Sequence, residues 1–224
     1  MDLRMKPLIR LATAALALGV VIATPLVALA STQQRLSVAG LGAEAFFSTC
    51  GGVPPLGVVC TDTYINVASS LVKSGGSKSS GTSLFLDQTN YICDPAKCDL
   101  ISETIGLGPA SLSIDTKLTM ASATASVPVA TCVPDPDIVG NVICTPDTGV
   151  VAVSASWTGV GDLLRQVSNT HFSTRSFSEH FHFNGLMRFA TASATVNGTN
   201  LGVSDFLGDM FNVKTSQIDI CHIC

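Results

Sequence analysis

Four close pairs of cysteines are distributed along this chain of 224 residues: Cys50/Cys60, Cys93/Cys98, Cys132/Cys144 and Cys221/Cys224. In the first three pairs, the residues in between are rich in turn formers such as Gly, Pro and Asp. Each of these pairs is therefore expected to bridge the two ends of one loop as a local disulfide. Because disulfides persist outside the reducing cytoplasm, the pairs also predict an exported protein.

The last pair, Cys221 and Cys224, has a different spacing. Residues three apart in an extended strand are separated by about 10 Å, so a bridge here requires the chain to curl. A redox Cys-x-x-Cys motif normally opens a helix of an α/β unit, and the sequence offers no such unit. A structural disulfide is the leading interpretation, with zinc ligation and redox chemistry as alternatives.

Residues 1–30 have the layout of a secretory signal peptide. Arg4, Lys6 and Arg10 form a basic head, an apolar run follows, and Ala28-Leu29-Ala30 supplies small residues at a cleavage site. We expect removal of this segment, a secreted chain that begins at Ser31, and no membrane span after cleavage. An uncleaved membrane anchor is the alternative interpretation.

Composition restricts the partners of the remaining chain. Residues 31–224 carry nine of the twelve Lys and Arg residues and fifteen of the sixteen Asp and Glu residues, a net charge of −6. An acidic chain of this kind argues against nucleic acid as the default partner, because nucleic acid binding requires clustered cations. The length is compatible with a single all-β domain over residues 31–224.

Alternation of apolar and polar residues predicts half-buried antiparallel strands. It is clearest in three segments: residues 111–120, residues 151–158 and residues 176–183. We predict an all-β, antiparallel β-sandwich or jelly roll, with a β-barrel as the alternative. Asn184-Gly185 and Asn197-Gly198 each predict a hairpin turn, and the Ser- and Gly-rich segment 73–81 predicts a mobile loop.

The segment from Arg165 to Arg188 holds three of the four histidines and several phenylalanines. On a strand, His180 and His182 project from the same side about 7 Å apart, with the phenylalanines on the opposite side. Trp157 is by default a core residue, and a sugar-stacking platform is its alternative role. The candidate ligand-binding residues are His171, Arg175, His180, His182, Arg188 and Trp157.

No catalytic motif stands out, and no cofactor or metal is expected. The sequence favours a secreted binding or structural domain acting at the cell surface or in the medium, with a glycan, an anionic ligand or a cell-surface protein as its partner. A secreted hydrolase with a site around His171, His180 and Arg188 is the alternative. The sequence leaves the oligomeric state open.

Overall fold

The computed structural model describes residues 34–53, 57–94, 97–138, 141–174, 177–204 and 208–221. The predicted signal peptide, Arg175 and Cys224 lie outside these ranges, and within them the chain is almost entirely extended. No helix in the described ranges has the length and apolarity needed to cross a membrane. The strands are β1 (Gln34–Val53), β2 (Gly57–Ser74), β3 (Ser77–Cys93), β4 (Cys98–Ile114), β5 (Met120–Pro134), β6 (Val142–Ser173), β7 (Phe177–Val196), β8 (Thr199–Val203) and β9 (Gly208–Cys221).

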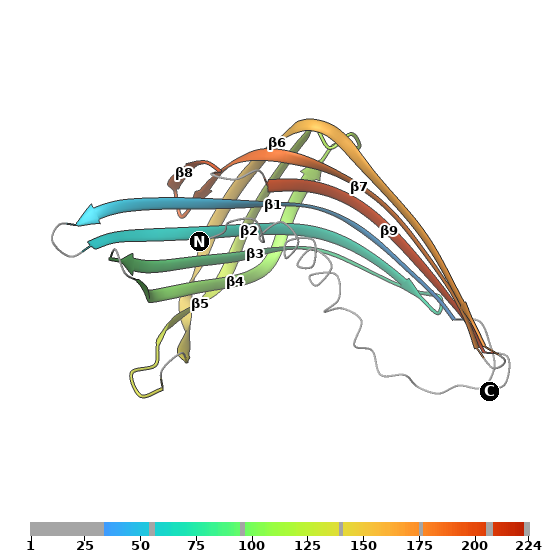
Figure 1. Ribbon diagram of the computed structural model, residues 1–224, viewed down its shortest axis with the longest axis horizontal. Coiled ribbons are helices and arrows are strands. Elements are labelled where there is room, and N and C mark those ends of the chain that lie inside the picture. The colour runs from blue at the N-terminus through green and yellow to red at the C-terminus, as the bar shows by residue number, and fades with distance from the viewer. Residues whose placement is uncertain are drawn as a thin grey trace.

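The described strands form one antiparallel sheet that closes on itself. Its order is β6-β5-β4-β3-β2-β1-β9-β7-β8, and β6 also pairs with β7, which completes a ring (Figure 1). Side chains that alternate toward the ring interior form the core, and they include Ala45, Ile65, Leu84, Val127 and Trp157. The predicted all-β, antiparallel architecture is confirmed, with the strands in one sheet and not in two separate ones.

The ring is uneven, because two pairs of neighbouring strands separate at one end of the molecule. The β3–β4 pairing stops at Ser83 and Pro109, and the β5–β6 pairing stops at Met120 and Thr158. Beyond these points six strands continue as an open sheet that curves toward the lower right of Figure 1. We call this part the open end; it comprises residues 77–82, 69–74, 34–41, 212–221, 177–187 and 164–173, in the order of the strands across the sheet.

Three disulfides lie at the opposite end from the open end. Cys50–Cys60, Cys93–Cys98 and Cys132–Cys144 each join two directly paired residues, with Cα–Cα separations of 4.1, 4.0 and 3.9 Å. The three hairpins that they bridge follow alternate strands of an antiparallel sheet, so all three lie at one end. The predicted local pairing is confirmed for these six cysteines, and the pairing of Cys221 with Cys224 stays a prediction.

Several predicted boundaries were wrong, because single strands continue through residues that resemble turns. Asn184-Gly185 lies inside β7, where Gly185 pairs with both Gln166 and Val213. The glycine-rich segment 159–162 also resembles a turn between two strands, but Gly161, with a φ of 71°, belongs to an irregularity within β6, and the strand continues past it. The predicted hairpin at Asn197-Gly198 is present, and it leads into β8, a strand that the sequence pattern did not reveal.

The predicted mobile loop at 73–81 is also corrected. Ser74 and Ser77 are directly paired, and only Gly75 and Gly76 lie between β2 and β3. Their φ angles of 54° and 85° are ones that glycine adopts without strain, and they are typical of a two-residue hairpin turn. The segment is therefore a tight turn followed by a regular strand.

The turn between β4 and β5 is held together by one carboxylate. Asp115 accepts hydrogen bonds from the Thr119 hydroxyl and from the backbone N–H groups of Lys117, Thr119 and Met120, at 2.5–2.9 Å. These bonds, chiefly the one from the Thr119 hydroxyl, lower the pKa of Asp115 to about 2. The turn buries Leu118, with an exposed fraction of 0%, and leaves Met120 66% exposed. The predicted alternation therefore ends at Ile114, and the expected burial of Met120 was wrong.

We expect the Asp115→Asn variant to unfold at a lower temperature than the wild type at neutral pH. Since the pKa of Asp115 is lowered by folding, its stabilising contribution is present above about pH 4 and is lost as the pH falls toward 2. The difference in melting temperature between the two proteins should therefore shrink across this range. Circular dichroism melts from pH 2 to 7 would measure it, with the exposed Asp137→Asn as the control. A difference that is independent of pH would contradict this role of Asp115.

Candidate functional site

The histidines predicted to form a surface do gather at the open end. His171 of β6 is paired directly with His180 of β7, and the two imidazole rings are stacked with their centroids 4.1 Å apart and an interplanar angle of 18°. Two residues further along β7, the Nδ1–H group of His182 donates a hydrogen bond to Oδ1 of Asn169 on β6. All three histidines are exposed on one side of the sheet, the side that the period-two pattern predicted for His180 and His182.

A row of polar residues crosses the open end at the level of His182. Residues that are directly paired in adjacent strands point to the same side of a sheet, so register identifies the members of the row. From the β3 edge to the β6 edge, the row consists of Lys78, Lys73, Ser37, Ser216, His182 and Asn169. Neighbouring strands lie about 4.8 Å apart, so this row is about 24 Å long.

Cations from five strands share this side of the open end with the histidines. Because side chains alternate along a strand, residues an even number of positions away from a member of the row point to the same side. No Asp or Glu of the described open-end residues points there. We call this surface the cationic face; its basic residues are Arg35, Lys73, Lys78, Arg165 and Lys214, together with His171, His180 and His182.

Seven acidic residues of β1, β2, β3, β4, β7 and β9 lie on the other side of the sheet. By the same register, that side carries Glu44, Asp62, Asp87, Glu103, Glu179, Asp209 and Asp219. Glu44 belongs to a hydrogen-bond network within the fold. The Tyr64 hydroxyl donates to Glu44 Oε2 at 2.5 Å, and Asn66 Nδ2 donates to the Tyr64 oxygen at 3.2 Å. Burial, followed by the charge of Glu44, raises the pKa of Tyr64, so the hydroxyl stays a donor. At the open end, where Glu179 and Asp219 belong to this set, the two faces of the sheet therefore differ in sign of charge.

The cations of the cationic face are available to a ligand. All five Lys and Arg side chains are exposed, and no ion pair to any of the five is seen among the described residues; the ion pair that is seen joins Lys97 to Asp99 at the start of β4. Lys73 and Lys78 are directly opposite each other across two paired strands. Like charges in this position repel each other, and an anion bound between them would relieve the repulsion.

Two of the residues predicted for ligand binding lie elsewhere. Trp157 is 1% exposed in the ring interior and its Nε1–H donates to the backbone oxygen of Glu44 at 2.9 Å, so its default role as a core residue is confirmed and its ring offers no surface for a sugar. Arg188 points to the same side as the histidines but is eight residues from His180 along β7, or about 26 Å. Arg175 lies outside the described residues.

This geometry gives the hydrolase hypothesis no assembled site. His171 and His180 are in contact, but Arg188 is too far away to act on the same substrate atoms. No carboxylate of the described open end points to the side of the histidines, so neither imidazole has the acidic partner that orients a catalytic histidine. Within the described residues, no group of three or more His, Cys, Asp or Glu side chains is placed to hold a metal ion.

The sequence matches no protein-family model and no curated protein, so an assignment of function depends on the chemistry of the cationic face.

Proposed function

We propose that this chain is a secreted binding domain that holds an acidic polysaccharide on the cationic face. Secretion is supported by the signal-peptide pattern of residues 1–30 and by three disulfides in the described part of the chain. The observation that carries the binding role is the concentration of five exposed Lys and Arg residues, and three histidines, on one face without any described acidic side chain.

The shape of the cationic face suits an extended ligand better than a small anion. Its cations are spread across a sheet about 24 Å wide, with Lys73 and Lys78 near one edge, Lys214 near the middle and Arg165 at the other edge. A polymer with repeated negative charges could meet several of them at once. Serine, threonine and asparagine side chains between the cations can donate hydrogen bonds to sugar hydroxyl and carboxylate groups.

A nucleic acid is the less favoured polyanion. Proteins that bind single strands without strong sequence preference place aromatic side chains where the bases can stack on them. At the open end the phenylalanines Phe172, Phe181 and Phe183 all point to the side opposite the histidines. The cationic face therefore offers charge and hydrogen bonds without aromatic platforms other than imidazole.

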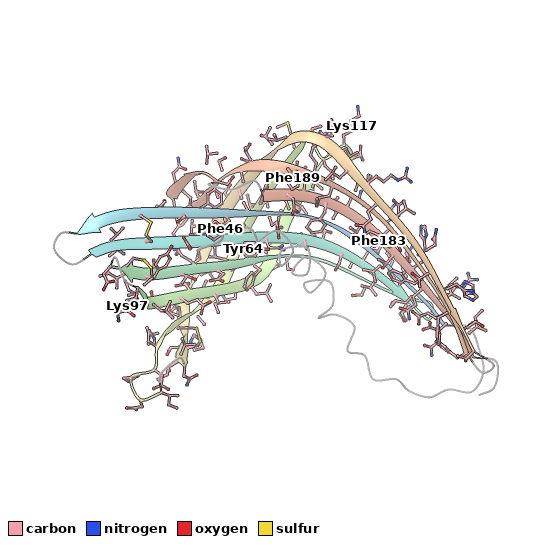
Figure 2. All side chains as sticks on the ribbon, in the orientation of Figure 1. Phe46, Tyr64, Lys97, Lys117, Phe183 and Phe189 are labelled. Atoms are coloured by element: carbon pink, nitrogen blue, oxygen red, sulfur yellow. A yellow bond between two sulfur atoms is a disulfide. The ribbon has the colours of Figure 1, made fainter. Side chains whose placement is uncertain are left out.

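Charge reversal tests this function. In the double variant Lys73→Glu and Lys78→Glu, two attractive contacts become repulsive, so we expect the affinity for polygalacturonate at low salt to fall about tenfold or more. The control is the double variant Lys97→Glu and Lys117→Glu, which changes the net charge equally. Figure 2 shows Lys97 at the left and Lys117 at the top of the molecule, away from the open end. Titration calorimetry would measure the affinity of each protein.

The histidines provide a second arm of this experiment. The double variant His180→Gln and His182→Gln removes two imidazole rings from the cationic face, so we expect it to bind polygalacturonate more weakly than the wild type. It should keep its fold, because both side chains are exposed. An equal loss of affinity in the Lys73/Lys78 and Lys97/Lys117 double variants would contradict the proposal, and so would binding that persists in about 1 M salt. Preference for single-stranded DNA would indicate a nucleic acid ligand instead.

A further inference from the structure

Among the strands that the structure describes, one long edge of the open end has no pairing partner. From Leu164 to Ser173, β6 pairs with β7 on one side, while its pairing with β5 has already ended at Thr158. Every residue of this segment is exposed, and no irregularity interrupts its register. The segment is therefore a regular edge strand ten residues long.

The backbone groups on this edge can be assigned from the hairpin that follows. The N–H of Thr174 donates to the carbonyl oxygen of Phe177, so the backbone groups of Thr174 face β7. In an antiparallel ladder the direction alternates from residue to residue. The odd-numbered residues from Arg165 to Ser173 therefore direct five N–H and five C=O groups outward, where a further strand could pair with them.

The other edge of the open sheet, in β3, is protected against pairing with a further strand, whereas the β6 edge is not. Residues 77–82 of β3 also extend past their pairing with β4, but this edge is short and consists of Ser, Lys, Gly and Thr. Lysine and short length are devices by which proteins prevent edge-to-edge pairing. The β6 edge contains no Lys, Pro, Asp or Glu, and its Leu164, Val167 and Phe172 are 44%, 49% and 56% exposed.

The sequence of the β6 edge is nearly symmetric about Ser168. The two residues four positions away from Ser168 are both apolar (Leu164 and Phe172). The two residues three positions away are both basic (Arg165 and His171). Antiparallel pairing of two copies about Ser168 would place Leu164 opposite Phe172, and Gln166 opposite Thr170. The outward-facing backbone groups of Arg165 and His171 would then meet as a hydrogen-bonded pair.

We propose that the β6 edge of one chain pairs with the β6 edge of a second copy, antiparallel and related by a two-fold axis at Ser168. A two-fold contact of this kind closes after two chains, since each edge is used once. It would join two open ends into one continuous sheet of twelve strands. Because paired residues share a side, the cationic faces of the two chains would lie next to each other, although the pairing itself does not depend on what that face binds.

Sedimentation velocity over a range of concentrations tests the proposal, with no polyanion present. We expect the apparent mass of the wild type to rise toward about twice that of the monomer, and Val167→Pro to stay monomeric. The N–H lost in this variant points outward, so the β6–β7 ladder keeps its hydrogen bonds. The matched control is Ser80→Pro. Ser80 lies at the level of Val167 on the opposite edge of the sheet, and the two-residue turn at Gly75-Gly76 directs its N–H outward.

Amide hydrogen exchange supplies a readout at the residues themselves. In the wild type, the amides of Asn169 and His171 should exchange more slowly as the concentration rises, and in Val167→Pro this dependence should disappear. Thermal melts of the two proline variants should agree if both retain the fold. A wild type that is monomeric at every concentration would overturn the proposal, and so would a dimer that persists in Val167→Pro. Loss of assembly in Ser80→Pro would show a contact between the β6 and β3 edges instead.

Discussion

Replacement of Trp157 by alanine is expected to lower the free energy of unfolding by about 3–5 kcal/mol. The indole is 1% exposed inside the ring, and its register partners on both sides are alanines, Ala121 of β5 and Ala192 of β7. Because these neighbours are small, the indole ring alone fills this part of the ring interior, and replacing it by a methyl group leaves a large cavity. The variant also loses the donor to the Glu44 carbonyl. Chemical denaturation followed by circular dichroism would measure the loss.

Two further variants separate the causes of that loss. Trp157→Phe keeps most of the apolar volume but leaves the Glu44 carbonyl without this donor, so an intermediate loss of about 1–3 kcal/mol is expected. Thr158→Ala, at an exposed position on the opposite side of β6, should change the free energy by no more than about 0.5 kcal/mol. Similar losses at positions 157 and 158 would mean that Trp157 does not fill the ring.

The fold class could be predicted because its signals are local. Alternation over eight to ten residues identifies a strand and its sides without knowledge of its partners, which is why the exposure of His180 and His182 was predicted. Cysteines 5 to 12 residues apart bridge the hairpin that contains them. The Asn197-Gly198 turn is equally local, with φ angles of 49° and 79°.

The same turn signal was misleading at Asn184-Gly185, and packing explains why. A Cβ atom at Gly185 would lie 2.8 Å from Cζ of Phe183, so the glycine makes room for the aromatic ring two residues earlier on the same strand. This requirement arises only in the folded sheet. The sequence alone does not distinguish a glycine that is needed for the positive φ of a turn from one that is needed because a neighbouring side chain leaves no room for a Cβ atom.

The cationic face was beyond sequence reasoning for a different reason. Its residues come from six strands, and Arg35 of β1 lies level with His180 of β7 only because both residues are paired with Ile218 of β9. This alignment depends on the register between strands that are far apart in the sequence, and no local sequence pattern specifies that register. The local signals that predicted the histidine pair therefore identified one edge of the surface and missed Lys73, Lys78 and Lys214.

Removal of the Cys132–Cys144 disulfide is expected to have the second largest effect on stability. In the chain-entropy description, a bridge between residues 12 apart contributes about 3 kcal/mol and one between residues 5 apart contributes about 2 kcal/mol. The double variant Cys132→Ala and Cys144→Ala should therefore lose more stability than Cys93→Ala and Cys98→Ala. Chemical denaturation under non-reducing conditions would compare them.

The location of the bridges adds a second expectation to this comparison. Both disulfides join residues that are already directly paired at the end remote from the open end, so their removal relaxes a hairpin without changing the register of the six open strands. Binding of polygalacturonate should then be unchanged at temperatures where the variants are folded. A larger loss for the Cys93–Cys98 pair would contradict the entropic account, and a loss of binding would mean that the bridges set the register of the whole sheet.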